Sequence, residues 1–340
     1  MKIGLFALFD NFKDSMGEAI KDQLELSLLA DSLGFDEIWL GEHHLNTFSV
    51  VPDPITLMSY IAAKTKHIKI GSAGFLAPYY HPIRLAESLA MLDVLSGGRL
   101  NIGFAKGGFA PDSRVFLQNK EDLQALMLET IEVVNLLLKG EKVSFKGRFL
   151  DITNSFITPK PLQKTIPTYI ATFSSPTSIK YAAKHGYGLM MSQGASLDEC
   201  VAAQELYKSI SGFEPEMVVM RVLYIDSSYG SAKQSVMPVI DYFVKCMRAS
   251  GAELVQPSFN LVEQTRLIKE REEFFVAHKF LDNAILGTPQ ECAIELDKFS
   301  KEIKNLHIGL KPSSSDVLKN KEMLEVFVKE VKPKLKKGGG

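Results

Sequence analysis

Eight strand-like segments alternate with helix-like segments along this chain of 340 residues, and that alternation predicts an α/β fold of the (β/α)8 barrel type. Two further observations favour a closed barrel over an open sheet. Residues 7–11, which follow the first predicted strand, lack the glycine-rich turn that an open dinucleotide-binding sheet uses. Residues 250–285 interrupt the alternation, as a lid over the open face of a barrel does. We therefore expect a single barrel domain over residues 1–335, with a disordered tail at 336–340.

The predicted strands are short runs rich in apolar and aromatic residues. Residues 35–41 show the pattern well, because Phe35, Ile38 and Trp39 suit a buried strand and polar residues follow at its end. In parallel α/β folds the carboxyl ends of the strands meet on one face and carry the chemistry. The eight predicted strands are 2–8, 35–41, 67–71, 99–105, 168–172, 187–191, 216–225 and 305–309.

The predicted helices carry apolar residues at helical spacing, and several have recognisable ends. Helix 54–64 begins with Asp53 as its N-cap and Pro54 at its first position. Helix 82–96 stops at Gly97 and Gly98. The other predicted helices are 18–33, 122–139, 176–184, 197–210, 231–249, 271–280, 289–300 and 316–331, and a small hairpin is expected at 142–152.

Composition narrows the class of protein. The chain is 46% hydrophobic and 23% charged with a formal net charge of −1, which is typical of a globular protein and gives no support for nucleic acid or a membrane as the main partner. Cys200, Cys246 and Cys292 are far apart without metal-ligand spacing, so we expect reduced thiols in a cytoplasmic protein. No apolar run approaches the length of a membrane span.

The second predicted strand ends in Glu42, His43 and His44. Imidazoles suit proton transfer near neutral pH or metal binding. The structural alternative is a pair of histidines hydrogen-bonded within a loop. A histidine pair after a carboxylate at a strand's carboxyl end favours a functional interpretation. Adjacent histidines on a strand point to opposite sides and no third ligand is evident, so we predict no metal site.

A second candidate lies at the start of predicted helix 176–184. Hydroxyls and exposed N–H groups at a helix N-terminus bind anions, phosphate above all. Plain N-capping by a serine explains the pattern equally well, and both interpretations stay open. Lys106 follows the fourth predicted strand and adds a cation near the same face. The hydroxyl groups come from Ser174, Ser175 and Ser178.

Three stretches together resemble the bacterial luciferase-like flavin monooxygenase family. They are GFDEIWLGEHH at 34–44, APYYHPIRLAE at 77–87 and LDVLSGGRLNIGFAKG at 92–107, within a resemblance that spans nearly the whole chain. The resemblance implies an FMN-dependent monooxygenase that oxidises a small organic substrate through a C4a-peroxyflavin. A separate NAD(P)H:flavin reductase would supply the reduced FMN. Two alternatives stay open: hydride transfer with the deazaflavin F420, and a non-catalytic flavin-binding protein.

The resemblance also implies roles for single residues. His43 matches the family's catalytic base, and Glu42 is its neighbour in the motif. Ala73 and Gly74 match a position where the luciferases have a non-prolyl cis peptide bond beneath the flavin ring. Lys106 falls where the luciferase α chain has a phosphate-binding arginine. The flavin phosphate would be held by the segment containing Ser174, Ser175 and Ser178.

Two further implications concern substrate and assembly. The reactive cysteine of the luciferase α chain is replaced here by Ala105, so we expect no light emission. The loop at 45–51 differs in sequence, so the resemblance does not imply the aldehyde substrate of the luciferases. Members of the family often pair through helices equivalent to 54–64 and 82–96. We therefore expect a homodimer, although the small residues on these helices suit packing against the barrel equally well.

Overall fold

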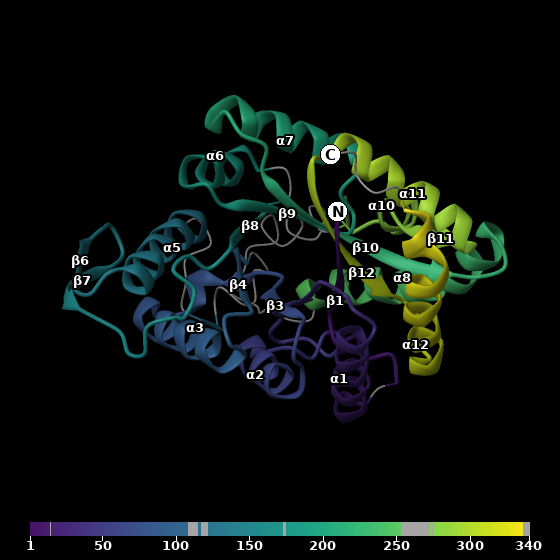
Figure 1. Cartoon of the computed structure of the whole chain (residues 1–340), viewed down its shortest axis with the longest axis horizontal. Coiled ribbons are helices and arrows are strands. Elements are labelled where there is room, and N and C mark those ends of the chain that lie inside the picture. The colour runs from purple at the N-terminus through teal and green to yellow at the C-terminus, as the bar shows by residue number, and fades with distance from the viewer. Residues whose placement is uncertain are drawn as a thin grey trace.

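The computed structural model describes residues 1–13, 15–107, 115–116, 122–172, 175–252, 269, 272–273 and 275–335. Eight parallel strands form a closed barrel, and each pairs with the next in chain order until the last pairs with the first. The predicted (β/α)8 barrel is confirmed, and all eight predicted strands are present (Figure 1). They are β1 (Lys2–Ala7), β2 (Glu37–Leu40), β3 (Lys69–Ser72), β5 (Leu100–Ala105), β8 (Thr168–Thr172), β9 (Gly188–Met191), β10 (Glu216–Ile225) and β12 (Asn305–Pro312).

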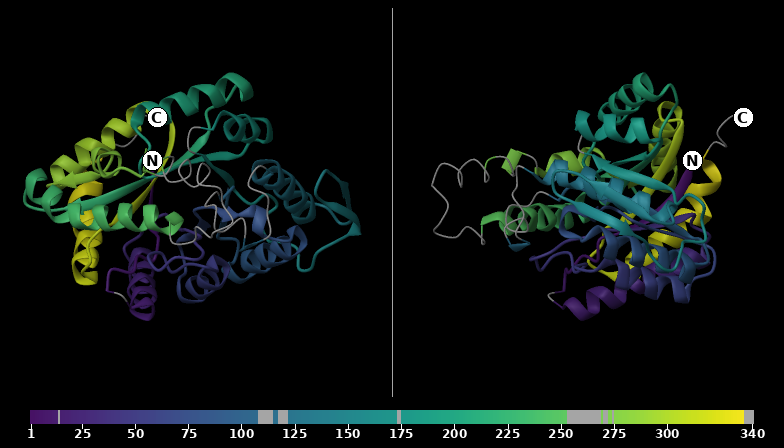
Figure 2. Two further views of the ribbon diagram at one scale, coloured as in Figure 1. Left: turned by 180° about the vertical axis from the view of Figure 1, so that it is seen from behind. Right: turned by 90° about the vertical axis from the view of Figure 1, so that its left-hand side faces the viewer.

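The helices lie outside the strands (Figure 2). Two predicted helix ends are confirmed, because the Asp53 side chain accepts a hydrogen bond from Thr56 N and Gly97 adopts a left-handed conformation at φ 69°. In the part of the chain that the structure describes, no helix is both long and apolar enough to cross a membrane. The main helices are α1 (Met16–Ser32), α2 (Pro54–Lys64), α3 (Pro82–Ser96), α5 (Leu123–Lys139), α6 (Pro176–His185), α7 (Leu197–Ser211), α8 (Tyr229–Ala252), α11 (Pro289–Glu302) and α12 (Val317–Val326).

The expected insertion at 250–285 is only partly described. Its predicted helix at 271–280 corresponds to the shorter α10 (Ala277–Asp282), while residues 253–268, 270–271 and 274 lie outside the described residues. A strand that the sequence did not predict, β11 (Ile285–Gly287), closes this region. Strand β10 is ten residues long and its last three residues pair with β11, although the first of them, Leu223, is also paired with Pro312 of β12. The predicted tail at 336–340 also lies outside the described residues.

Two small elements lie outside the eight-stranded barrel. The predicted hairpin is confirmed as β6 (Val143–Lys146) and β7 (Asp151–Ser155), which projects from one side of the molecule next to α5 (Figure 1). The two-residue strand β4 (Phe75–Leu76) pairs with β5 after β3 has ended, and the short 3-10 turn η1 (Ala77–Tyr79) follows it. All three cysteines lie in helices, and none of them forms a disulfide bond.

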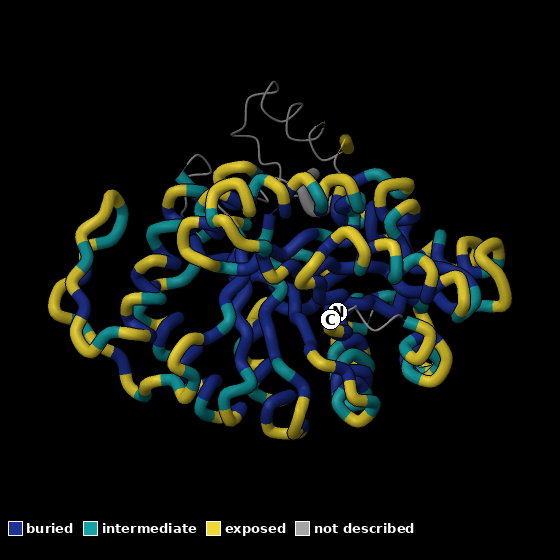
Figure 3. The backbone as a smooth tube through the Cα atoms, turned by 45° about the horizontal axis from the view of Figure 1, so that its top comes forward, coloured by how far each residue is buried: buried dark blue, intermediate teal, exposed yellow. Residues whose placement is uncertain are grey.

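Strand register identifies the residues that point into the barrel, because paired residues of parallel strands share a face. A Cβ built on Gly4 would lie 3.2 Å from Trp39 Cδ1, and one built on Gly71 would collide with the same indole ring. Gly4, Trp39 and Gly71 therefore occupy inward positions, and so do the residues that alternate with them. The strands form the buried centre of the molecule, and exposed residues lie on the outer faces of the helices (Figure 3).

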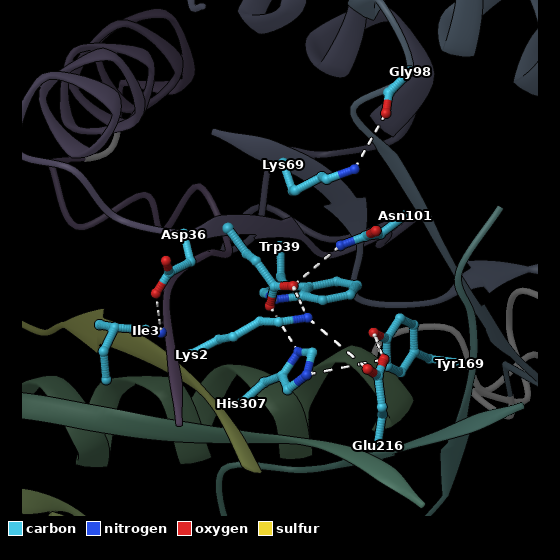
Figure 4. Close-up of polar contacts among 11 residues, drawn as sticks. Lys2, Ile3, Asp36, Trp39, Lys69, Gly98, Asn101, Tyr169, Glu216 and His307 are labelled. Atoms are coloured by element: carbon cyan, nitrogen blue, oxygen red, sulfur yellow. Dashed lines mark hydrogen bonds and ion pairs between the residues drawn. The ribbon is translucent and has the colours of Figure 1, made fainter. Parts of the chain in front are cut away.

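A group of polar side chains, buried except for Lys2, lies at the amino end of the barrel (Figure 4). Glu37 Oε2 accepts a hydrogen bond from Trp39 Nε1 at 3.2 Å and lies 3.0 Å from His307 Nδ1. Its other oxygen, Oε1, accepts from Asn101 Nδ2 at 3.3 Å and lies 3.9 Å from Lys2 Nζ. We call these five residues the amino-end cluster. Both oxygens of its carboxylate have partners.

Candidate active site

His43 lies inside the barrel at the carboxyl end of β2. Gly41 follows the inward positions Glu37 and Trp39, and a Cβ built on it would lie 3.6 Å from the His43 ring and 2.9 Å from Leu8. The His43 ring therefore occupies the inner side of the barrel mouth. Its backbone N–H donates to Val51 O at 3.0 Å, which fixes the returning loop.

The environment of His43 keeps its imidazole neutral. Burial, and to a smaller extent charge repulsion from the nearby His44 and Lys311, together lower the pKa of His43 from 6.5 to about 4. At neutral pH the ring is unprotonated and can accept a proton. This is the state that a general base requires.

Glu42 and His44 point the other way, toward the surrounding helices. The Glu42 side chain is 1% exposed, and its Oε1 lies 2.9 Å from His44 Nε2. Its Oε2 accepts hydrogen bonds from Leu76 N at 3.1 Å and from the Tyr80 hydroxyl at 2.9 Å. Burial and the Glu42 charge raise the pKa of Tyr80, so its hydroxyl remains a donor. Glu42 thus ties the end of β2 to the segment after β3, a positioning arrangement outside the barrel interior.

Three inward residues at the carboxyl end of the barrel are small and partly exposed. Ala105 and Ala171 occupy inward positions of β5 and β8, and Ala73 follows β3 in the same alternation. These three alanines are only partly buried, whereas the inward Met220 of β10 is 2% exposed. Small, partly exposed residues on neighbouring strands leave room for a flat ligand against the backbone.

Gly74 borders these residues and must be glycine. Its φ is +120°, and a Cβ built on it would lie 2.6 Å from Ala105 Cβ. The cis peptide bond expected between Ala73 and Gly74 is not present: this bond is trans, and the one cis bond in the described ranges precedes Pro159. The positive φ of Gly74 turns the chain here without a cis bond.

The predicted anion site lies at the start of α6. Ser175 is the N-cap, with its Oγ 3.5 Å from Ser178 N and its own N–H donating to Thr172 Oγ1 at 3.0 Å. The capping interpretation is thus confirmed, and the long 3.5 Å contact leaves the Ser178 N–H weakly bonded. Lys106 is exposed directly after β5, the neighbour of β8, so it lies at the same end of the barrel as Ser175. Ser174 lies outside the described residues.

Three polar residues of this region escaped the sequence analysis. Tyr80 lies within a recognised motif, but nothing in the sequence identifies it as a partner of Glu42. Asp10 follows β1, and Lys311 lies near the end of β12, where their side chains form an ion pair at 2.6 Å. The predicted last strand ended at 309, two residues short of Lys311. The sequence could have identified Asp10 and Lys311 only as charged residues just after two predicted strands.

A groove at the opposite end of the barrel is an alternative candidate for the active site because of its size. It has a volume of about 670 Å³ and lies between the loops that precede β8, β9 and β10. Lys164, Tyr187 and Glu214 line it, and the Tyr169 hydroxyl donates to Glu216 at 2.7 Å within it. We place the chemistry at the carboxyl end, because (β/α)8 barrels build their reactive sites there. Among the described residues, no group of three or more metal-ligating side chains could hold a metal ion.

The fold and the carboxyl-end histidine define the class of protein: a (β/α)8 barrel with a buried histidine at the carboxyl ends of its strands. The family model of the luciferase-like monooxygenases matches residues 1–302, and the chain belongs to this family. It is 29% identical over 245 residues to the oxygenase component of a flavin-dependent trigonelline monooxygenase from Acinetobacter baylyi, covering 68% of this chain and 67% of the relative. It is 26% identical over 340 residues to the alkanal monooxygenase alpha chain of Photobacterium leiognathi, covering 95% of both.

Solved structures show the same fold. A monooxygenase from Streptomyces bottropensis superposes with a TM-score of 0.84 at 24% identity, covering 98% of this chain and 99% of that one. The oxygenating constituent of a 3,6-diketocamphane monooxygenase from Pseudomonas putida, solved with FMN, gives 0.79 at 18% identity and 99% coverage of both chains. An F420-dependent secondary alcohol dehydrogenase gives 0.76 at 19% identity, covering 98% of this chain and 99% of that one. The fold therefore accommodates both kinds of flavin.

Proposed function

We propose that the protein is an FMN-dependent monooxygenase that uses reduced flavin and O2 to oxidise a small organic substrate. The observation that supports this most directly is the neutral His43 at the inner edge of a barrel mouth lined by Ala73, Ala105 and Ala171. Reduced FMN, when bound, would supply the electrons and the activation of oxygen. The protein binds and orients the ring, excludes water and moves a proton at His43 Nε2 or Nδ1.

The described residues fit FMN in two respects. The alanine-lined side of the mouth fits a flat ring, and Gly74 lets the backbone approach it closely. The N-terminus of α6 with Ser175 and Ser178, and the exposed cation of Lys106 on the neighbouring strand, fit the flavin phosphate. Lysine serves here as a point charge without the bidentate geometry of arginine.

Glu42 has a positioning role in this proposal. Its carboxylate is held by Leu76, Tyr80 and His44 and does not face the barrel interior. It fixes the loop that carries His43 and the segment next to Gly74 relative to each other. Its replacement would therefore disturb both the base and the flavin side of the mouth.

Two partners complete the proposal. A separate NAD(P)H:flavin reductase would deliver reduced FMN, which is supported by the trigonelline relative's being the oxygenase component of its monooxygenase. A second copy of the chain would pair through α2 and α3, where Tyr60, Met91 and Leu95 are 46–60% exposed. Ala86 and Ala90 are buried within the monomer, so the outward apolar side chains would carry such a contact. Light scattering tests this; a monomeric mass would end the dimer proposal.

The experiment for the flavin is an anaerobic titration of the full chain with reduced FMN and, in parallel, with reduced F420, followed by flavin absorbance. We expect tight binding of FMN and weak binding of F420. If only F420 binds, the protein would instead be a hydride-transfer enzyme that uses F420. If neither cofactor binds, the proposal that the protein uses a flavin would be wrong. His43→Ala serves as the companion variant, because it should retain FMN affinity if His43 acts on protons rather than holding the ring. A non-catalytic flavin binder would lose nothing from this change.

A further inference from the structure

A buried ion pair lies in the barrel mouth that also contains His43. Lys311 occupies an inward position of β12, two residues beyond Gly309, whose missing side chain makes room for Met220 in the interior. Lys311 Nζ lies 2.6 Å from Asp10 Oδ2, and the two side chains are 5% and 9% exposed. Strand β1 separates β12 from β2, so this carboxyl-end pair and His43 belong to three adjacent strands.

Apolar rings enclose one side of this pair. The Lys311 ammonium lies 5.8 Å from the ring centre of Phe48 and 5.3 Å from that of Phe243. These rings come from the loop after β2 and from α8, and their centres are 5.5 Å apart. The rings shield the ammonium from water and interact favourably with its charge. They do not offer a hydrogen-bond acceptor in their plane.

The pair is incompletely satisfied. Asp10 Oδ1 is buried and has no hydrogen-bond partner among the residues that the structure describes. Burial raises the pKa of Asp10 despite the neighbouring Lys311. A buried carboxylate oxygen without a donor is costly, and apolar replacement of a buried ion pair often preserves or improves stability. Stability of the barrel therefore does not account for the pair.

The other fully buried cation of the barrel strands shows the contrast. Arg221 points outward from β10, and its two terminal nitrogens donate to the carbonyl oxygens of Ser192, Met220 and Ala195, while its Nε is buried without a partner among the described residues. That guanidinium fastens the end of β9, a structural task. Lys311 donates to no comparable set of carbonyl oxygens among the described contacts. Its ion-pair partner Asp10 has one carboxylate oxygen, Oδ1, without a hydrogen-bond partner.

We propose that Asp10 and Lys311 form a substrate-recognition site for a group that both donates and accepts a hydrogen bond, such as a carboxamide or a hydroxyl. The ammonium of Lys311 donates to the oxygen of that group, and Asp10 Oδ1 accepts its N–H or O–H. The inference rests on the proposed function, because it orients the substrate beside His43. The substrate class becomes amides and alcohols with an apolar body, rather than plain hydrocarbons.

Benzamide and acetophenone test this as matched probes, because they share the ring and the carbonyl and differ in an N–H donor against a methyl group. Binding of each to the full chain without flavin is measured by ligand-observed NMR titration. We expect benzamide to bind at least about tenfold more tightly, the effect of a hydrogen bond to a charged group. In the double variant Asp10→Leu/Lys311→Met the preference should disappear. Equal affinities in the wild type, or a preference that survives in the double variant, would overturn the proposal.

Stability and a matched pair elsewhere control the experiment. The melting temperature of the double variant should equal or exceed that of the wild type. Asp10→Asn keeps the side-chain shape and serves as the second variant if the double variant does not fold; its preference should also fall. Glu25→Leu/Lys321→Met removes an outer ion pair of 2.7 Å and should leave the probe preference unchanged. Reduced FMN is titrated into the same proteins, and failure of the wild type to bind it would contradict the proposed function. The ratio of the affinities for benzamide and acetophenone tests the recognition site separately.

Discussion

The buried carboxylates at the two ends of the barrel interior differ in how completely they are hydrogen-bonded. At the amino end, both oxygens of Glu37 have partners within the amino-end cluster. At the carboxyl end, one oxygen of Asp10 lacks a partner among the described residues, His43 is held neutral, and three inward alanines are partly exposed. A closed polar network stabilises a fold, whereas an open one is available to a ligand. The comparison therefore separates the end that holds the barrel together from the end where we propose the chemistry.

The largest expected effect concerns His43. His43→Gln removes the proton acceptor and should reduce turnover on a substrate found by screening by roughly 10²- to 10⁴-fold. The affinity for reduced FMN should change little, and both quantities come from steady-state and binding titrations. His81→Gln is the matched control, since His81 is an exposed histidine at the start of α3. Unchanged turnover in His43→Gln would remove the base assignment.

Glu37 should dominate stability at the other end. Glu37→Ala leaves Trp39 Nε1, Asn101 Nδ2 and His307 Nδ1 without their acceptor, and should lower the free energy of unfolding by roughly 3–5 kcal/mol. Urea denaturation measures it. Glu87→Ala is the control, because the Arg84–Glu87 pair is exposed and its loss should cost less than about 0.5 kcal/mol. Similar losses from both variants would erase the contrast drawn above.

The pH dependence of stability should reveal the environment of His43. Its pKa is 6.5 in the unfolded chain and about 4 in the folded one, so between these values the unfolded state binds more protons. The contribution of His43 to stability is complete above pH 6.5 and is lost as the pH falls toward 4, by up to about 3 kcal/mol. The free-energy difference between wild type and His43→Gln, measured across this range, isolates it from Asp10. A difference that does not vary with pH would mean that the ring is solvated.

Gly74 should give the smallest effect of the four. Gly74→Ala forces a Cβ into φ +120° and against Ala105, which should destabilise the fold by roughly 1–3 kcal/mol and weaken FMN binding. Gly17→Ala is the control, because Gly17 lies in α1 with open space around it, and alanine there should stabilise by up to about 1 kcal/mol. Equal stabilities in both variants would show that the turn after β3 is not constrained.

The sequence predicted the barrel because its signals are local. Alternating apolar strands and capped helices such as the one beginning at Asp53 identify themselves within a few residues. His43 was found for the same reason, since a strand that ends in titratable side chains is visible along the chain. The location of β11 was not predictable, because three apolar residues become a strand only when the long β10 offers a free edge.

Long-range partners explain the remaining gaps. Glu42 and Tyr80 are 38 residues apart, and Asp10 and Lys311 lie at opposite ends of the chain, so only barrel closure brings each pair together. The direction of Glu42 also depends on strand register, which fixes the inward face at 37, 39 and 41. Glu42 and His43, which are adjacent in one motif, therefore have different roles in the proposal. The sequence treats Glu42 and His43 as one unit, and the structure assigns them to opposite sides of the strand.

The most direct test of this account locates the flavin. Hydrogen–deuterium exchange of the full chain, with and without reduced FMN under anaerobic conditions, compares the two ends of the barrel in one experiment. We predict slower exchange with FMN in peptides that cover residues 41–44, 73–76, 105–107 and 175–178. Peptides at 161–169 and 211–216, which line the amino-end groove, should be unchanged. Protection of the amino-end peptides instead would contradict the assignment of the carboxyl end as the reactive site.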